Sequence, residues 1–378
     1  MVVFFDFITP VGKIPDKQRI TLNYYSRSKS MENIERYKNQ LSLLRGKTVA
    51  IVYIFEGETA SGFNHYWVWK SNIISGWLNA VQEIGCVPFI LDVRTFVQKA
   101  VNNTLPHIDF VVNLNCGSYE LSSMSLVPSV CSFLSIPCIP CDAAAIVMSE
   151  NKMISNLLAI SKGVTLPKSI EKPSANGIYR PLNLGSSIGI RIGETADISH
   201  GTYQEFIPGY DATLPIVYNP LKNDIDLLPL IIYLPKHLDP YWIYDADEKE
   251  KDNGFTILIR MHLEDSIKNK LINFAKVFPI TTFGRIDFRI KTHDNKLSPD
   301  IVTQPINEED LFFVEMNSMP TIETNDSFEF AMNAAMASEN HSFYDCINTY
   351  MLENNNGTIN GFLLSCSMLA LKKNSNGV

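Results

Sequence analysis

The sequence GRIDF at residues 284–288 and the sequence FVEMN at residues 313–317 decide how this chain is interpreted. In each segment apolar residues alternate with charged or amide residues, which predicts a strand with one polar face. If the two strands pair, three side chains with oxygen ligands and one guanidinium share a face: Asp287, Glu315, Asn317 and Arg285. Oxygen ligands beside a guanidinium suit a complex of Mg²⁺ with a polyphosphate. The pair of segments therefore favours a protein that handles a nucleoside triphosphate.

The composition describes a soluble globular protein with more than one core. The chain has 378 residues, of which 46% are hydrophobic and 19% charged, and its formal net charge is −8. Two or three lobes are expected at this length, and the negative charge argues against a nucleic-acid-binding protein. No apolar run reaches the length of a bilayer span, and residues 1–13 lack the basic start of a signal peptide. We therefore expect a cytoplasmic protein with no membrane partner.

The cysteines form one close pair, Cys138 and Cys141, within a total of seven. A CxxC pair can be a redox motif or half of a zinc site. No second CxxC and no pair of histidines lies at zinc spacing, and no helix clearly opens at Cys138. Small buried thiols at the end of a strand are the favoured interpretation.

The first half of the chain alternates between strand and helix patterns. A helix over residues 30–44, capped by Ser30, precedes the alternation. Strands are predicted over residues 47–55, 87–93, 110–114 and 138–140, with helices over 67–84 and 122–135. This alternation indicates a parallel sheet with helices on its faces.

The pattern changes after residue 148. Ser149 is expected to cap a helix that ends at Lys162. Short antiparallel strands are predicted next, over residues 165–172, 178–182, 188–192 and 203–207. Longer strands, a helix over 263–278 and two C-terminal helices follow. We predict five units: an extension with one helix (1–45), a parallel α/β domain (46–147), a small lobe (148–212), a large lobe with the metal site (213–338) and a C-terminal helical extension (339–378).

Three further segments carry polar chemistry, although each has a plain structural explanation. The loop over residues 184–189 offers backbone N–H groups and the hydroxyls of Ser186 and Ser187 to an anion, but GSS turns are common and this is no P-loop. Lys152 and Arg180 are the nearest upstream cations and could clamp phosphates, although isolated charges usually face solvent. The charged run over 244–251 is, by composition alone, a solvated loop.

In combination, these segments resemble the ATP-grasp enzymes, specifically their D-alanine–D-alanine ligase-like branch, over roughly residues 46–335. The matching motifs are NK at 151–152, YRP at 179–181 with GSSIG at 185–189, QEFIPGYD at 204–211, YD with a lysine over 244–249, GRID at 284–287, and EMN with a proline over 315–320. The resemblance implies a three-lobed ATP-grasp fold, α/β and α+β in class, that begins with a parallel α/β domain. It also implies a reaction in which ATP activates a carboxylate as an acyl phosphate, which an amine attacks, with release of ADP and phosphate.

The resemblance also assigns roles to residues. ATP would be bound by Lys152, Arg180, Ser186, Ser187, Gln204, Glu205, Phe206, Ile207, Asp211 and Lys249. Two Mg²⁺ ions, for which Mn²⁺ can substitute, would be held by Asp287, Glu315 and Asn317. Arg285 would stabilise the oxyanion of the tetrahedral intermediate, with Ser186 and Lys249 as further catalytic residues.

The chain departs from this family where the substrates bind. Asp326, followed by Ser327, stands where the ligases carry the serine that grips the second alanine's carboxylate. An aspartate there would repel a carboxylate and could attract an amine. Glu58 is the nearest candidate for the catalytic glutamate that these ligases carry in their N-terminal domain. Arg180, which precedes Pro181, stands where the ligases usually have a lysine. The ATP half of the site is thus kept and the amino-acid half is rebuilt.

These departures favour a ligase that acts on another pair of small molecules, a carboxylate such as an amino acid or small peptide and an amine, in peptide or natural-product biosynthesis. A peptide or carrier-protein group is a further candidate for the acceptor. Two alternatives stay open: D-alanine–D-alanine ligase itself, and a non-catalytic ATP-binding regulatory protein. Retention of the complete metal set, Asp287, Glu315 and Asn317, argues against the regulatory protein. The apolar faces near the N-terminus leave room for a homodimer.

Overall fold

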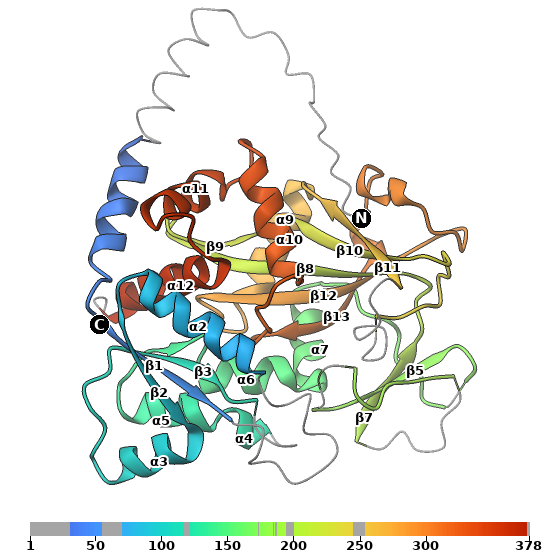
Figure 1. Cartoon of the computed structure of the whole chain (residues 1–378). Coiled ribbons are helices and arrows are strands. Elements are labelled where there is room, and N and C mark those ends of the chain that lie inside the picture. The colour runs from blue at the N-terminus through green and yellow to red at the C-terminus, as the bar shows by residue number, and fades with distance from the viewer. Residues whose placement is uncertain are drawn as a thin grey trace, which may run out of the picture.

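The computed structural model describes residues 31–54, 70–116, 121–172, 174–183, 185, 187–193, 200–244 and 254–375. Three residues with predicted roles, Glu58, Ser186 and Lys249, lie outside the described residues, as do residues 1–30. Three sheets organise the part that is described (Figure 1).

The first sheet is parallel, as the alternating pattern predicted. Its strands are β1 (Thr48–Tyr53), β2 (Val87–Asp92), β3 (Phe110–Leu114) and β4 (Cys138–Ile139), in the order β2-β1-β3-β4. Its helices are α2 (Ser71–Glu83), α3 (Val93–Val101), α4 (Leu121–Met124) and α5 (Leu126–Phe133). The helix α3 was not predicted. Its signal is Asp92, whose carboxylate accepts the N–H of Thr95 at 2.8 Å and so caps the helix.

The CxxC pair lies in this unit, and the interpretation as buried thiols is confirmed. All seven cysteines are free, and both Cys138 and Cys141 are buried. Burial raises the pKa of the Cys141 thiol to about 12, so this side chain stays protonated near neutral pH.

Two helices follow where the sequence predicted one. These are α6 (Ala143–Glu150) and α7 (Lys152–Ser161), and Asn151 caps α7 by accepting the N–H of Ile154 at 3.1 Å. The prediction that Ser149 is the cap was wrong, because its hydroxyl is bonded to the hydroxyl of Ser318 at 2.7 Å. The break at Asn151 places Lys152 in the first turn of a helix that packs against β13.

The second sheet is small and antiparallel. It contains β5 (Gly177–Pro181), β6 (Arg191–Ile192) and β7 (Gly201–Glu205) in the order β6-β5-β7. The strand predicted over residues 165–172 was wrong, since only Ser169 forms an isolated bridge, to Gln204.

The third sheet forms the platform of the site. Its strands are β8 (Gly209–Asn219), β9 (Asp224–Leu227), β10 (Leu230–Pro235), β11 (Phe255–Arg260), β12 (Phe283–Lys291) and β13 (Leu311–Asn317). The order is β11-β10-β8-β12-β13, with β9 paired to β8. Two short 3₁₀ helices, η2 (Pro299–Val302) and η3 (Glu308–Asp310), lie between β12 and β13.

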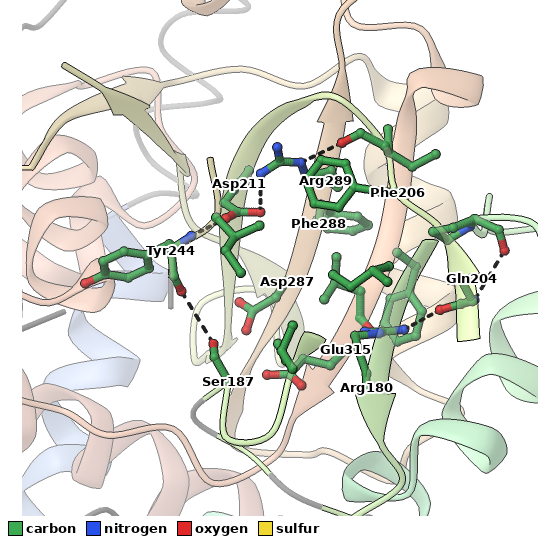
Figure 2. A pocket seen from close by; sticks show the side chains of 18 of the residues that line it. Arg180, Ser187, Gln204, Phe206, Asp211, Tyr244, Asp287, Phe288, Arg289 and Glu315 are labelled. Atoms are coloured by element: carbon green, nitrogen blue, oxygen red, sulfur yellow. Dashed lines mark hydrogen bonds and ion pairs between the residues drawn. The ribbon is translucent and has the colours of Figure 1, made fainter. Parts of the chain in front are cut away.

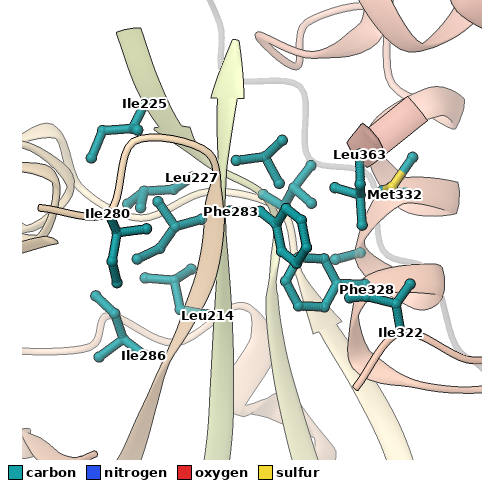
Figure 3. Packing of buried hydrophobic residues seen from close by; sticks show 14 of the residues in the cluster. Leu214, Ile225, Leu227, Ile280, Phe283, Ile286, Ile322, Phe328, Met332 and Leu363 are labelled. Atoms are coloured by element: carbon teal, nitrogen blue, oxygen red, sulfur yellow. The ribbon is translucent and has the colours of Figure 1, made fainter. Parts of the chain in front are cut away.

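Helices cover this platform and join it to the first unit. They are α9 (Asp265–Ala275), α10 (Ser327–Ala337), α11 (Tyr344–Glu353) and α12 (Ile359–Ser375). Phe283 of β12 meets Phe328 of α10 edge to face, with ring centroids 6.0 Å apart (Figure 3). Glu83 of α2 accepts hydrogen bonds from the Tyr350 hydroxyl and from the N–H of Thr358, the latter at 2.9 Å. Within the described residues, no helix has both the length and the apolar character that a membrane span requires.

Candidate active site

The strands β12 and β13 pair in the register that the sequence predicted. Arg285 lies opposite Asn317, and Asp287 lies opposite Glu315. Between them, Ile286 and Met316 also pair and are 0% and 1% exposed. Because side chains alternate across a sheet, the four polar residues share the opposite face. A register shift follows Asp287.

The carboxylate of Asp287 is held from two sides. The Nη2 atom of Arg285 lies 3.1 Å from its Oδ2 atom, and the hydroxyl of Thr213 donates to its Oδ1 atom at 2.8 Å. Burial opposes the charge of Arg285, but Asp287, Tyr233 and Glu315 outweigh it and raise the pKa of the guanidinium above its usual range. Arg285 therefore remains a cation at any physiological pH.

The carboxylate of Glu315 is paired with a lysine from another part of the chain. The Nζ atom of Lys152 lies 3.6 Å from its Oε2 atom, and Lys152 is 5% exposed. Burial lowers the pKa of Lys152, and the charge of Glu315 opposes that shift. The third predicted ligand, Asn317, accepts the N–H of Met319 at 3.0 Å through Oδ1, which leaves that oxygen one lone pair.

This donor set fits a hard cation. It consists of two carboxylates on paired positions and one amide oxygen, which is the ligand type that Mg²⁺ takes. Among the described residues, no group of three His, Cys, Asp or Glu side chains is placed to hold a metal ion. The amide of Asn317 would therefore complete the set beside the two acids.

Arg180 is more tightly bound to the protein than the sequence suggested. Its Nη1 atom donates to the carbonyl of Val314 at 2.6 Å, and its Nη2 atom donates to the side chain of Gln204 at 2.7 Å (Figure 2). The residue is 4% exposed, and burial lowers its pKa. Arg180 thus joins β5 to β13 and β7, and its remaining N–H groups lie at the wall of a cavity.

The segment after β7 links the small sheet to the large one. The N–H groups of Glu205 and Phe206 donate to the carbonyls of Lys168 and Asn176, each at 2.8 Å. The N–H of Ile207 has no hydrogen-bond partner among the described residues. Of the backbone donors predicted to reach a nucleobase, Ile207 therefore has the one that is available.

Asp211 of β8 connects this segment with Tyr244, which lies in the stretch between β10 and β11. Its Oδ1 atom lies 2.9 Å from Nη1 of Arg289, and its Oδ2 atom accepts the N–H of Tyr244 at 2.6 Å. Arg289 in turn donates to the carbonyl of Ile207 at 2.8 Å and lies 5.1 Å from the ring centroid of Phe206. Asp211 therefore holds Arg289 and Tyr244, two residues that line the cavity, in position.

A cavity of about 920 Å³, including its part open to solvent, lies between the small and large sheets. One part of its wall is apolar and is formed by Ile178, Ile190, Phe206, Phe288 and Phe313. The charged groups Arg285, Asp287 and Glu315 line it as well (Figure 2). Ser187 of the predicted anion-binding loop also lines the cavity, and its hydroxyl donates to the carbonyl of Tyr244 at 3.5 Å. The cavity wall thus brings together the predicted ATP-binding residues that the structure describes, apart from Lys152, and two of the three predicted metal ligands; Asn317, Asp326 and Ser327 do not line it.

The predicted substrate residue Asp326 is the N-cap of α10. Its Oδ1 atom accepts the N–H groups of Phe328 and Glu329 at 2.8 Å and 3.0 Å, and its Oδ2 atom accepts that of Glu323 at 3.1 Å. Burial raises the pKa of Asp326 to about 6, against the opposing effect of these N–H groups and of Arg285. Ser327 is 5% exposed, and its hydroxyl has no partner among the described residues.

One acid at the site was missed by the sequence analysis. Glu150, the last residue of α6, lies within electrostatic reach of Glu315, Lys152 and Arg285. Burial and the charge of Glu315 raise its pKa to about 7. Its position two residues before Lys152 was the available signal, but the motif that was matched begins only at Asn151.

Comparisons with known proteins, by sequence and by structure, both lead to D-alanine-dependent ligases. No protein-family model matches the sequence. The D-alanine–D-alanine ligase of Coprothermobacter proteolyticus is 23% identical over 225 residues, which cover 51% of this chain and 67% of that protein.

Solved structures match over most of the chain. The D-alanine–D-alanine ligase from Bacillus anthracis complexed with ATP has a TM-score of 0.52 at 13% identity and covers 82% of this chain and 99% of its own. The VanG D-Ala:D-Ser ligase from Enterococcus faecalis also has a TM-score of 0.52 at 13% identity, with coverage of 81% and 100%. The predicted fold class is confirmed, and the chain has the fold of the D-alanine–D-alanine ligases.

Proposed function

We propose that this protein is an ATP-dependent ligase that joins a carboxylate to an amine and releases ADP and phosphate. The observation that carries the proposal is the pairing of Asp287 with Glu315 at the cavity wall, with Arg285 and Lys152 beside them. Nucleotide binding alone does not require two facing carboxylates that are each matched by a cation. Transfer of a phosphoryl group does, because charge must be balanced as it moves.

ATP fits the cavity in one orientation. The apolar wall suits the adenine ring, and the free N–H of Ile207 can donate to a ring nitrogen. The triphosphate would then extend toward Arg180, Lys152 and the two carboxylates, beneath Ser187. The Bacillus anthracis ligase, which shares the fold, was solved in complex with ATP, and this supports ATP as the ligand of the cavity. Bound Mg²⁺, held by Asp287, Glu315 and Asn317, would supply neutralisation of the β- and γ-phosphates.

The reaction would proceed in two displacements. An oxygen of the carboxylate substrate attacks the γ-phosphorus, the bond from that phosphorus to the β–γ bridging oxygen breaks, and ADP leaves. The amine nitrogen then attacks the carbonyl carbon of the acyl phosphate, the bond from carbon to the phosphate oxygen breaks, and phosphate leaves as the nitrogen loses a proton. Arg285 would stabilise the oxyanion that forms when the amine attacks and that collapses when phosphate leaves, because its guanidinium stays charged.

The substrates proposed here differ from two molecules of D-alanine. The carboxylate would be an amino acid or a small peptide, and the acceptor another amine, including an amine of a peptide or carrier protein. Asp326 in place of the usual serine supports this proposal. The reaction class fits peptide or natural-product assembly.

Trapping with hydroxylamine tests the proposal directly. The protein is incubated with ATP, Mg²⁺ and a panel of carboxylates, and hydroxamates and condensed products are detected by mass spectrometry. We expect ADP formation to require a carboxylate and phosphate release to rise when an amine is added, and we expect Glu315→Gln to abolish both. Brisk formation of D-alanyl-D-alanine would identify an orthodox ligase. ATP binding without turnover across the panel would identify a non-catalytic ATP-binding protein and overturn the proposal.

A further inference from the structure

We infer that Thr213 is a positioning residue for the metal site, because its hydroxyl keeps one oxygen of Asp287 apart from Arg285. The inference rests on the proposed function, in which Asp287, Glu315 and Asn317 hold Mg²⁺. It adds a residue outside that ligand set, and it is drawn from the strand register and the hydrogen bonds at the wall of the cavity.

Thr213 belongs to the same row of side chains as the two carboxylates. Thr213 of β8 lies opposite Asp287 of β12, and Asp287 lies opposite Glu315 of β13. Residues that are paired across neighbouring strands present their side chains on the same face of the sheet. All three of these residues line the cavity. The row therefore places a hydroxyl beside Asp287, on the side away from Glu315.

The contacts of Asp287 divide its two oxygens between different partners. Both Nε and Nη2 of Arg285 approach the Oδ2 atom, at 3.2 Å and 3.1 Å. The hydroxyl of Thr213 donates to the Oδ1 atom at 2.8 Å. Arginine and carboxylate frequently pair through two parallel bonds that use both carboxylate oxygens. Here both nitrogens of the guanidinium meet one oxygen, and the threonine holds the other.

The surroundings of Thr213 hold its hydroxyl in this direction. The residue is 4% exposed, so water has little access to the hydroxyl. Its branched β-carbon restricts rotation about χ1, and β8 lies inside the sheet, between β10 and β12. A side chain with little freedom to move therefore orients the carboxylate before any ligand binds.

This arrangement affects how a cation competes with Arg285 for Asp287. A carboxylate oxygen can accept more than one partner, so Oδ1 can take a cation while it still accepts the hydroxyl of Thr213. Without that hydroxyl, we expect the carboxylate to turn until both of its oxygens meet the guanidinium. A cation would then have to displace a charge-assisted hydrogen bond at either oxygen. Thr213 thus makes Asp287 a better metal ligand without contacting the metal.

Two substitutions of Thr213 test the inference through metal binding, which needs no turnover. Thr213→Val keeps the branched shape and removes the hydroxyl, whereas Thr213→Ser keeps the hydroxyl. Binding of Mn²⁺ in the presence of a non-hydrolysable ATP analogue is followed by electron paramagnetic resonance, with the analogue alone as the blank. We expect the Kd for Mn²⁺ to rise about tenfold in Thr213→Val and at most about twofold in Thr213→Ser.

Thr282→Val is the matched control for loss of a buried threonine hydroxyl. Thr282 directly precedes β12, is 0% exposed and donates its hydroxyl to the carbonyl of Pro140. This variant should lower the free energy of unfolding, because it leaves that carbonyl without its partner, but it should not change the Kd for Mn²⁺. A rise in Kd as large as that of Thr213→Val would show a general effect of sheet stability and overturn the inference.

The Arg285→Ala background separates positioning from a merely structural effect. No guanidinium competes for Asp287 in this background, so Thr213→Val should change the Kd for Mn²⁺ by at most about twofold. An equal rise in both backgrounds, or an unchanged Kd in Thr213→Val alone, overturns the inference. Absence of Mn²⁺ binding in the wild type overturns the metal assignment and this inference with it. Absence of hydroxamate with every carboxylate overturns the proposed function, whereas hydroxamate formation with an unchanged Kd in Thr213→Val overturns only this inference.

Discussion

Asp287 of β12 lies directly opposite Glu315 of β13, and each of these two carboxylates has its own cation, partly buried for Asp287 and buried for Glu315. Arg285 is 3.1 Å from the first, and Lys152 is 3.6 Å from the second. The two cations come from distant parts of the chain, since Lys152 begins α7 and Arg285 lies within β12. The centre is therefore balanced in charge before any ligand arrives, and a cation bound between the carboxylates must compete with Arg285 and Lys152.

Neutralising either carboxylate should abolish turnover and leave the fold intact. In Asp287→Asn and Glu315→Gln we expect phosphate release to fall at least about 100-fold, because each variant loses a carboxylate that would hold the Mg²⁺ needed to neutralise the phosphates. The free energy of unfolding should change by only about 1 to 2 kcal/mol, since each variant loses an ion pair but also a repulsion. A coupled phosphate assay and chemical denaturation measure the two effects. Asp224→Asn, which alters an exposed acid paired with Lys276, is the control, and full activity in either site variant would refute the metal assignment.

Removing the guanidinium of Arg285 should slow the chemical step. We expect Arg285→Ala to lower kcat by about 10² to 10³ with little change in KM for ATP, because the oxyanion exists only during the second displacement, after the amine has attacked and before phosphate leaves. Arg285→Lys should recover little of this loss, since an ammonium cannot reproduce the bonds through Nε and Nη2 to Asp287. Steady-state kinetics with varied ATP separate kcat from KM. A large rise in KM with unchanged kcat would instead place Arg285 in nucleotide binding.

The sequence was sufficient wherever a local pattern carries the information. Alternation of polar and apolar residues in β12 and β13 predicted both strands, and the polar faces predicted their pairing. The parallel sheet followed from the order of its elements. The start of α7 could not be predicted in this way, because Ser149 and Asn151 are both good N-cap residues. The hydrogen bond from Ser149 to Ser318 leaves Asn151 as the residue that caps the helix.

The electrostatic details of the site could not be predicted from the sequence, because they also depend on contacts between residues that are distant in the chain. Arg180 was predicted as a phosphate clamp, but two of its donors are taken by Val314 and Gln204, which are remote in sequence. Glu150 became notable only once α6 had packed against β13 and brought it near Glu315. Such contacts depend on which helix meets which strand, and no periodicity in the chain encodes them.

Removing the contacts of Asp211 should weaken ATP binding more than catalysis. Asp211 holds both Arg289 and the N–H of Tyr244. In Asp211→Ala we expect KM for ATP to rise about tenfold, since Arg289 also positions the carbonyl of Ile207 at the adenine end, and kcat to fall less. Asp211→Asn retains an acceptor for Tyr244 and should give a smaller rise. Equal values for wild type and Asp211→Ala would show that the cavity wall is held without this contact.

The carboxyl group of Glu150 should make stability depend on pH in the metal-free protein. Its pKa in the folded state is about 7, whereas an unfolded glutamate titrates near about 4.3. Protonated Glu150 contributes its full stabilisation at a pH below its pKa in the unfolded state. This contribution is lost as the pH rises through its pKa in the folded state. Above pH 7 the folded protein must hold an ionised Glu150 close to Glu315.

Glu150→Gln should therefore stabilise the protein at pH 8 relative to pH 5, by about 1 to 3 kcal/mol in the free energy of unfolding, because the amide never acquires this charge. Urea denaturation in EDTA at both pH values measures the difference between variant and wild type. Glu353→Gln, which alters an exposed acid paired with Lys38, should show no such dependence. Addition of Mg²⁺ with ATP should reduce the advantage of Glu150→Gln at pH 8, since bound cations offset the repulsion from Glu315. An advantage of the same size at pH 5 and pH 8 would show that Glu150 does not titrate between these values, and that its carboxyl group lies outside the field of Glu315.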